Sequence, residues 1–332
     1  MLNFILRRLV ISFLVLIVIS AVSFFVIQLP PGDFASTYKT FLIQTAGLTE
    51  DRAEEMTKLV RQQYGLDQPV YVQYITWIKG IVTEGKFGFS FAYRKDAGEI
   101  ILDRLPKTLM LALLAHAIST FVGIFAGIYA APRQYSAGDN ILSVLAFILT
   151  SIPRFFIALV ILYVLVFTFR QHHITSFFSP EYVVAPWSWG KFLNLVQHIW
   201  PVVLIAGLGG VARNMRVMRG NLLDVLNAQY VTTARSKGLR ERTVMNGHAV
   251  PNALHPMVAY QGTALPYMLQ GELEATIVMG IPTLGPILYQ ALATQDIYLS
   301  GGALLMIAAL IVIGNLLSDI FLSILDPRIR YS

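Results

Sequence analysis

Apolar runs long enough to cross a membrane alternate with polar segments along this chain. The first run covers residues 9–29 and follows Arg7 and Arg8. About 20 apolar residues are needed to span the hydrocarbon core of a bilayer. A cleaved signal peptide would have a shorter core and a small-residue cleavage site, whereas the turn-forming sequence Pro-Pro-Gly follows this run. We therefore interpret it as an uncleaved first span.

Five further apolar runs are predicted to be membrane helices. They cover residues 108–130, 141–169, 197–212, 257–279 and 301–324. Pro153 lies in the second of these runs, where it removes a backbone hydrogen bond and should bend the helix. The sequence Ile-Pro-Thr-Leu-Gly at 281–285 is expected to turn the chain into a short outer segment before the last span. The pattern as a whole predicts six spans.

Residues 30–107 have a different composition. This segment holds ten basic and ten acidic residues, and it lacks an apolar run long enough to span. Two amphipathic helices are predicted in it, at 54–64 and 70–81, separated by Gly-Leu-Asp-Gln-Pro. We therefore predict three parts: an N-terminal transmembrane helix (1–29), a small, mostly helical extracytoplasmic domain (30–107) and a core of five transmembrane helices (108–332).

Composition and charge support an all-α polytopic membrane protein. Of the 332 residues, 55% are hydrophobic and 13% are charged, whereas about a quarter are charged in soluble domains. The net charge of +6 is concentrated at 213–256, which holds seven basic and two acidic residues. Because basic loops stay on the cytoplasmic side, we expect this segment and both termini in the cytoplasm, 30–107 outside, and no nucleic-acid partner. The chain has no cysteine, which excludes disulfides and thiolate metal sites.

Residues 227–256 form a polar elbow between the fourth and fifth spans. Its basic residues outnumber a single acid, and its intermittent apolar residues are typical of two short helices that dock on a surface. Gly238 should end the first helix, because glycine adopts the left-handed conformation without a clash. Pro251 should stop or kink the second.

This elbow resembles the cytoplasmic coupling loop of ABC-importer permeases. The family signature reads Glu-Ala-Ala, three residues, Gly, nine residues, then Ile-x-Leu-Pro. Ala234, Gly238 and Pro251 match it in register, whereas Thr232, Thr233 and His248 depart from it. The sequence Tyr-Val-x-x-Ala-Arg-x-Lys-Gly-Leu at 230–239 resembles the dipeptide/oligopeptide branch of the family, as do Tyr-Gly-Leu-Asp-Gln-Pro and Gly-Lys-Phe-Gly-Phe-Ser in the 30–107 segment.

The resemblance implies a type I ABC-importer permease in the bacterial cytoplasmic (inner) membrane, specifically the first permease subunit, which carries the large extracytoplasmic insertion. It implies a heterodimer with a second permease subunit, two cytoplasmic ATPases that bind ATP and magnesium, and an extracytoplasmic substrate-binding protein. The chain itself would be a transport subunit, not an enzyme, and would bind no cofactor. The expected ATPase-coupling residues are Tyr230, Thr232, Thr233, Ala234, Arg235, Gly238, Leu239 and Pro251.

Signatures of catalysis and metal binding are weak in the sequence. Gly-Ile-Val-Thr-Glu-Gly-Lys at 80–86 fits the first seven positions of a phosphate-binding loop, but Phe87 stands where Ser or Thr must hold magnesium. His172 and His173 have no further His or carboxylate at ligand spacing, so we predict loop residues and no metal site.

Polar residues at membrane depth are the candidates for a solute pathway. A charge there costs about 2.5–3.5 kcal/mol on insertion scales, so it should face a cavity or a partner. Arg154 lies deep in the third span and either lines the pathway or binds carbonyl groups freed at Pro153. The fifth span adds Gln261, Gln270, Glu272 and Glu274. Peptide permeases place a glutamate where Thr276 stands here. Glu272 and Glu274 therefore either line the pathway in a way that is particular to this chain or form a pair at the outer membrane interface.

Two other functional classes have different sequence requirements. A secondary transporter or channel subunit without ATPase partners would need no docking elbow and would usually show two inverted halves, a symmetry that we do not find. An intramembrane enzyme would need a reactive group of side chains within the spans. The substrate stays open among peptides, metal chelates, glutathione, opines and oligosaccharides.

Overall fold

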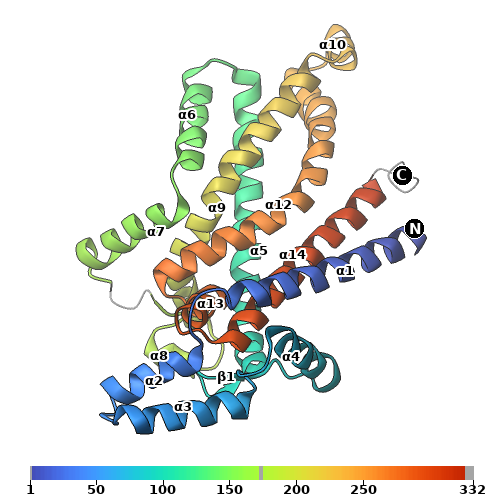
Figure 1. Cartoon of the computed structure of the whole chain (residues 1–332). Helices are drawn as coiled ribbons and strands as arrows, with labels where there is room; N and C mark the ends of the chain where they lie inside the picture. The colour runs from blue at the N-terminus through green and yellow to red at the C-terminus, as the bar shows by residue number, and fades with distance from the viewer. Residues whose placement is uncertain (1, 172–174, 326–332) are drawn as a thin grey trace. The chain divides into compact units, whose positions relative to one another are not determined.

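A computed structural model describes residues 2–171 and 175–325, and almost all of these residues are helical (Figure 1). Four helical segments in this part of the chain are long and apolar enough to cross a membrane: Ile5–Ile27, Ala97–Arg133, Trp189–Leu226 and Ile297–Ile320. Two further pairs of helices pass the same test together but are bent at a short break. The predicted all-α polytopic fold is confirmed, whereas the number of six spans stays a prediction.

The chain folds into two compact units. In the described part of the chain, the core unit contains residues 108–171, 175–281 and 313–325, and the N-terminal unit contains residues 2–107 and 282–312. Two helices, α5 (Ala97–Ala130) and α14 (Ile297–Leu325), have residues in both units.

The core unit is built from long helices joined by short ones. After α5 come a 3-10 turn (Ala131–Arg133), α6 (Ala137–Ser151), α7 (Arg154–Tyr163) with a π-helical turn (Val164–Thr168), α8 (Pro180–Val183), α9 (Trp189–Leu226), α10 (Gln229–Ser236), α11 (Glu241–Val244), a second π-helical turn (Met245–Ala249) and α12 (Val250–Met279). Helix α9 packs on α6, α7 and α12. It also extends beyond the predicted run 197–212 at both ends, because its polar ends continue the helix past the apolar stretch.

Glycines bring α5 close to α9. A Cβ atom at Gly123 would lie 2.7 Å from the carbonyl oxygen of Val211, and one at Gly127 would lie 2.8 Å from that of Met215. Small residues four apart let two membrane helices approach to backbone contact, where van der Waals packing holds them. This pair therefore sets the distance between the two longest helices of the core unit.

The predicted bend at Pro153 is a complete break between two helices. Ile152 and Pro153 both have extended backbone, with ψ angles of 128° and 136°. Helix α6 therefore ends at Ser151, α7 begins at Arg154, and the two helices meet at 97° (Figure 1). The residue before a proline is disfavoured in the α region, which explains why the helix stops instead of bending.

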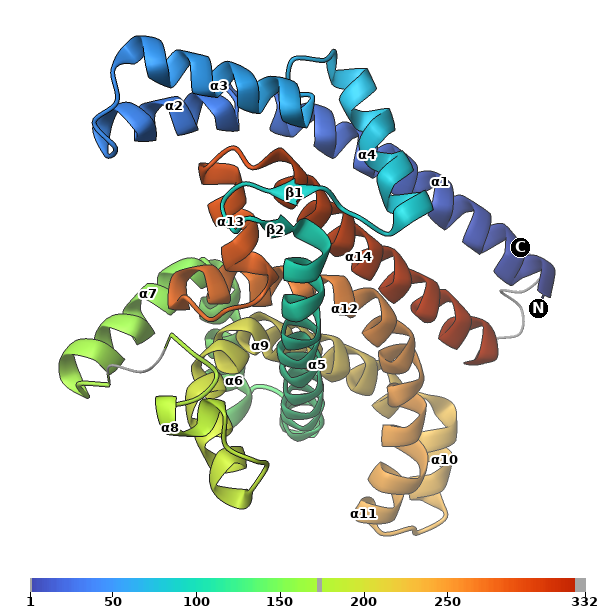
Figure 2. The ribbon, with the colours of Figure 1, turned by 90° about the horizontal axis from the view of Figure 1, so that it is seen from below.

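The N-terminal unit contains α1 (Leu2–Ile27), α2 (Phe34–Gln44), α3 (Glu50–Tyr64), α4 (Val70–Glu84), a two-stranded antiparallel hairpin of β1 (Phe89–Ser90) and β2 (Lys95–Asp96), and α13 (Leu284–Ala293). Figure 2 shows α2 and α3 side by side. The two predicted amphipathic helices are confirmed as α3 and α4. Neither α2 nor the hairpin was predicted.

Residues 282–312 group with residues 2–107 in the structure, whereas they were predicted to belong to the 108–332 part. A buried carboxylate explains the difference. Asp296, between α13 and α14, accepts hydrogen bonds from the Ser90 hydroxyl (2.7 Å) and from the backbone N–H of Ala92 (3.2 Å). The Tyr298 hydroxyl donates to the carbonyl of Tyr64 at 3.1 Å. The polar segment is thus bound to the turn that precedes the last long helix.

Candidate functional site

The elbow is held together by its own apolar residues. Val231 and Ala234 on α10 pack against Val244 on α11, and all three side chains are buried. Helix α10 lies beyond the ends of α9 and α12 (Figure 1), and α10 and α11 lie together in Figure 2. The apolar stripe seen in the sequence therefore folds the elbow, and it leaves the polar residues on the surface.

Gly238 forms the turn between α10 and α11. Its φ angle is +76°, which is the left-handed conformation expected from the sequence, and α10 ends at Ser236. No heavy atom lies within 4 Å of the position that a Cβ atom would occupy. A side chain at this position would strain the backbone without a clash inside this chain.

The predicted coupling residues divide into an exposed set and one buried residue. The exposed members are Tyr230, Thr232, Thr233, Arg235, Gly238, Leu239 and Pro251. Ala234 lies on the buried face of α10, where it contributes to the packing that holds the elbow together. The guanidinium of Arg235 donates two hydrogen bonds to the carboxylate of Glu241, at 2.7 and 3.2 Å, and thereby joins α10 to α11.

Pro251 does not stop the second helix, contrary to one of the two outcomes predicted for it. The chain stays helical from Glu241 to Met279, through the π-helical turn at Met245–Ala249. Pro251 lies shortly after this turn and inside the continuous helix, so the N–H that proline lacks is missing from the helical hydrogen bonds. The π-helical turn contains one extra residue, and this is the irregularity of the helix just before Pro251.

Three of the predicted pathway residues come together around one polar cavity of about 310 Å³ in the core unit. Arg154 reaches it from the start of α7, and Gln270 and Glu274 reach it from α12. The predicted shared face of Gln270 and Glu274 is therefore present. Arg213 and Tyr267 also line the cavity.

Two glycines make room for the guanidinium of Arg154. A Cβ atom at Gly271 of α12 would lie 2.7 Å from Nη1, and one at Gly209 of α9 would lie 3.3 Å from Nη2. Nη1 also donates a long hydrogen bond, 3.4 Å, to the carbonyl oxygen of Tyr267. The side chain thus crosses from α7 onto the α9–α12 pair, and its carbonyl partner is on α12, not on the residues freed at Pro153.

Sequence reasoning missed Arg213 and Tyr267 as members of this site. Arg213 was counted only among the basic charges near the elbow. Its guanidinium carbon lies 4.6 Å from the centre of the Tyr267 ring, which is a cation–π contact. The sequence holds no signal for this contact, because it depends on which face of α9 meets α12.

Two predicted residues lie apart from this cavity. Gln261 joins three helices, because its amide nitrogen donates to Asn214 Oδ1 at 2.8 Å and its oxygen accepts from the Thr120 hydroxyl at 2.7 Å. Glu272 is fully buried, and its backbone carbonyl accepts from the Thr276 hydroxyl at 2.9 Å. Neither side chain lines the polar cavity.

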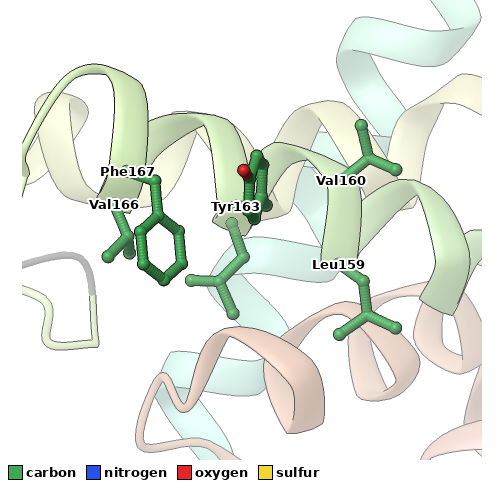
Figure 3. A pocket seen from close by; sticks show the side chains of 6 residues that line it. Leu159, Val160, Tyr163, Val166 and Phe167 are labelled. Carbon is green, nitrogen blue, oxygen red and sulfur yellow. The ribbon is translucent and has the colours of Figure 1, made fainter.

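An apolar groove on α7 differs in chemistry from the polar cavity. It has a volume of about 630 Å³, and side chains of α7 and of the π-helical turn after it line it (Figure 3). The lining is aliphatic and aromatic, with the hydroxyl of Tyr163 as its polar group. Such a surface suits lipid or another apolar helix better than a charged solute.

Metal binding finds no support in the described residues, where His, Asp and Glu form no group of three that could hold a metal ion. The predicted loop residues His172 and His173 lie outside the described ranges.

Comparisons with known proteins give a consistent result along the whole chain. Residues 123–331 match the family described as binding-protein-dependent transport system inner membrane component, and residues 1–112 match the N-terminal family of the same membrane components. A putative peptide permease protein of Brucella ovis is 34% identical over 331 residues, covering 99% of each chain. The oligopeptide transport system permease protein AppB of Bacillus subtilis is 30% identical over 329 residues, again covering 99% of each chain.

Proposed function

The chain belongs to the family of binding-protein-dependent transport system inner membrane components, and from this membership we propose how it binds its partners and moves its substrate. It is a multi-pass inner-membrane permease subunit of a peptide-type ABC importer. Members of this family are transport subunits and not enzymes, and ATP hydrolysis takes place on separate subunits. The predicted family and function are confirmed, and a secondary transporter or channel without ATPase partners is set aside.

The partners we propose are a second permease subunit in a heterodimer, two cytoplasmic ATPases that bind ATP and magnesium, and an extracytoplasmic binding protein. The substrate we propose is a peptide, because relatives that match over the full length are named peptide and oligopeptide permeases. Both termini and the 227–256 elbow are cytoplasmic in this proposal, and residues 30–107 face the outside and contact the binding protein. The basic balance of 213–256 supports this orientation.

One structural observation carries the mechanism: the two helices that enter and leave the elbow both line the polar cavity. Helix α9 holds Arg213 and ends at the elbow, and α12 begins at the elbow and holds Gln270 and Glu274. At a rise of 1.5 Å per residue, Arg213 lies about 20 Å along α9 from its end at Leu226. A movement of the elbow is therefore transmitted to the cavity by rigid helices.

The coupling step follows from this connection. ATP binding closes the two ATPases on each other and displaces the docked elbows, and α9 and α12 then open the cavity to the outside. Tyr230, Arg235 and Leu239 offer an exposed aromatic, basic and apolar surface for this docking. Because ATP and the loaded binding protein favour the same conformation, each must strengthen binding of the other.

Uptake by the reconstituted complex tests the proposed function. The permease pair, the ATPases and the binding protein are placed in proteoliposomes, and uptake of labelled alanine peptides of two to five residues is measured with and without ATP. We expect ATP-dependent uptake that requires the binding protein. ATP-dependent uptake of a metal chelate or an oligosaccharide, with no uptake of peptides, would contradict the proposed substrate class.

A further inference from the structure

The polar cavity contains two guanidinium groups that form no ion pair with a carboxylate of the described residues. In the described part of the chain, Arg154 bonds to a backbone carbonyl and Arg213 lies over an aromatic ring, and neither forms an ion pair. Arginine has five N–H donors, so most of those of Arg154 remain available in the cavity. Because a charge at membrane depth is expensive to leave without a partner, this cavity is suited to an anionic group from outside the chain.

The position of Arg154 is not explained by the stability of its helix. It is the first residue of α7, where the helix dipole disfavours a positive charge. Gly209 and Gly271 leave a slot for its guanidinium, and larger residues would displace it. Three helices thus place this cation at the cavity wall at some cost to α7, which is the arrangement of a binding group.

Tyr267 positions both arginines. Its carbonyl oxygen accepts a hydrogen bond from Arg154, and its ring lies under the guanidinium of Arg213. Stacking on a ring leaves the N–H edge of a guanidinium free, and a free edge fits a carboxylate through two parallel hydrogen bonds. Both arginines can therefore offer donors to one bound anion.

Glu274 gives the cavity a second sign of charge. Arg154 and Arg213 together with this single acid give the lining a net charge of +1. Glu274 lies one helical turn from Gln270 on α12. A volume of about 310 Å³ is at the lower end for ligand sites, so the cavity fits one end of a peptide and not a long chain.

We propose that this cavity is a specificity site that binds the C-terminal carboxylate of a peptide during transport, with Arg154 as the main partner and Arg213 as the second. This inference rests on the proposed function, since it assumes that the solute is a peptide. A carboxylate supplied by the second permease subunit would have the same chemistry, and the experiment distinguishes the two sources.

Equilibrium binding of labelled tri-alanine tests the proposal on the purified permease–ATPase complex, with the binding protein omitted. The free acid is compared with the C-terminal amide, which lacks the carboxylate. We expect the amide to bind about tenfold more weakly, because charge-assisted hydrogen bonds are lost. Arg154→Gln should weaken binding of the free acid by about the same factor and leave binding of the amide unchanged, and Arg154→Lys should restore part of the loss.

Arg216→Gln is the matched control, because Arg216 is an exposed arginine on α9, one turn from Arg213, and does not line the cavity. It should bind both peptides as the unchanged complex does. Equal binding of acid and amide, or no binding of the acid, would overturn the proposal. The proposal would also be overturned if Arg154→Gln weakened binding of both peptides equally and the second permease subunit was lost from the complex. That result would assign the pairing carboxylate to the second subunit. Peptide uptake on the same preparation tests the proposed function separately: uptake without acid preference refutes only this site, and no peptide uptake refutes both.

Discussion

Single residues determine how closely the helices of this permease approach and what their cavity can bind. Arg154, Gln270 and Glu274 could be selected from the sequence, because charged and amide groups are rare in apolar spans. Arg213 and Tyr267 could not, because their role depends on which faces of α9 and α12 meet. Sequence patterns report polarity along one helix, whereas a site is formed by packing between several.

Gly127 provides a residue-scale test of the α5–α9 contact. We expect Gly127→Leu to destabilise the protein by about 1–3 kcal/mol, the usual cost of overpacking, because a Cβ atom there would lie 2.7 Å from Met218 Cβ and 2.8 Å from the Met215 carbonyl. Thermal unfolding of the purified protein measures the effect. Gly220→Leu is the control, since this glycine of α9 has no heavy atom within 4 Å of its Cβ position. Equal melting temperatures for the two variants would contradict the close approach.

Asp33 provides a second residue-scale test, in the polar segment after α1. The carboxylate caps α2 by accepting from the Ser36 N–H at 2.8 Å, and it accepts from Arg61 Nε at 2.8 Å. Burial alone would raise the pKa of Asp33, but the hydrogen bonds from Arg61 and Ser36 outweigh burial and lower it. Because the pKa is lower in the folded state, the ionised carboxylate stabilises the fold. This stabilisation is fully present above the unfolded pKa, about 3.9, and is lost as the pH falls through the folded pKa.

The expected outcome is a pH-dependent difference between Asp33→Asn and the unchanged protein. Asparagine also caps helices, so this variant removes the charge and keeps the cap. We expect it to lower the free energy of unfolding by about 1 kcal/mol at pH 7, and this difference should shrink towards zero below pH 4. Asp33→Ala should lower the free energy of unfolding further, at pH 7 and at pH 3, because the cap is lost as well. A difference for Asp33→Asn that persists unchanged at pH 3 would rule out the ion pair as its cause.

At the scale of elements, the sequence predicts apolar helices well and the points where they break less well. The apolar runs correspond to long helices, because any segment in lipid must satisfy its own backbone hydrogen bonds. Pro153 was read as a bend, yet Ile152 and Pro153 together end one helix and begin the next. Pro251 was expected to stop or kink its helix; the helix does not stop there but continues through Pro251 after a π-helical turn.

The unpredicted helix α2 has a signal that could be recognised. Asp33 follows Pro-Pro-Gly and stands just before Phe34–Gln44, which is the order of a turn, an N-cap and a helix. The hairpin of β1 and β2 has two residues in each strand, too few for a pattern of alternating polarity to be visible.

At the scale of the whole molecule, the contact between 30–107 and 282–312 was out of reach of sequence patterns, since it depends on residues about 200 positions apart, such as Ser90 and Asp296. Orientation in the membrane, in contrast, can be predicted from charge alone. We predict that Ser90 faces the outside and that Arg133 and the elbow face the cytoplasm.

Single-cysteine labelling tests this orientation cleanly, because the natural chain has no cysteine. A membrane-impermeant reagent added to intact cells should label Thr83→Cys, at an exposed position of the same outer segment, and should label the exposed Ser236→Cys only after the membrane is opened. The reverse pattern would contradict the proposed topology.

The central claim is that the elbow transmits ATP binding to the cavity, and Gly238→Val tests it most directly. With φ at +76°, valine is strained by about 1–2 kcal/mol, and in a docked elbow its side chain also meets the ATPase surface. Gly47→Val is the matched control, because Gly47 has a φ of +67° and equally open surroundings but lies in the N-terminal unit.

The measurement is substrate-stimulated ATPase activity of the purified complex, with assembly checked by co-purification of all subunits. We predict that Gly238→Val assembles and loses most of its stimulation, and that Gly238→Asn keeps it because asparagine tolerates the left-handed conformation. Gly47→Val controls for the backbone strain and is expected to assemble with unchanged basal ATPase activity. Full stimulation of an assembled Gly238→Val complex would show that this elbow is not the coupling element.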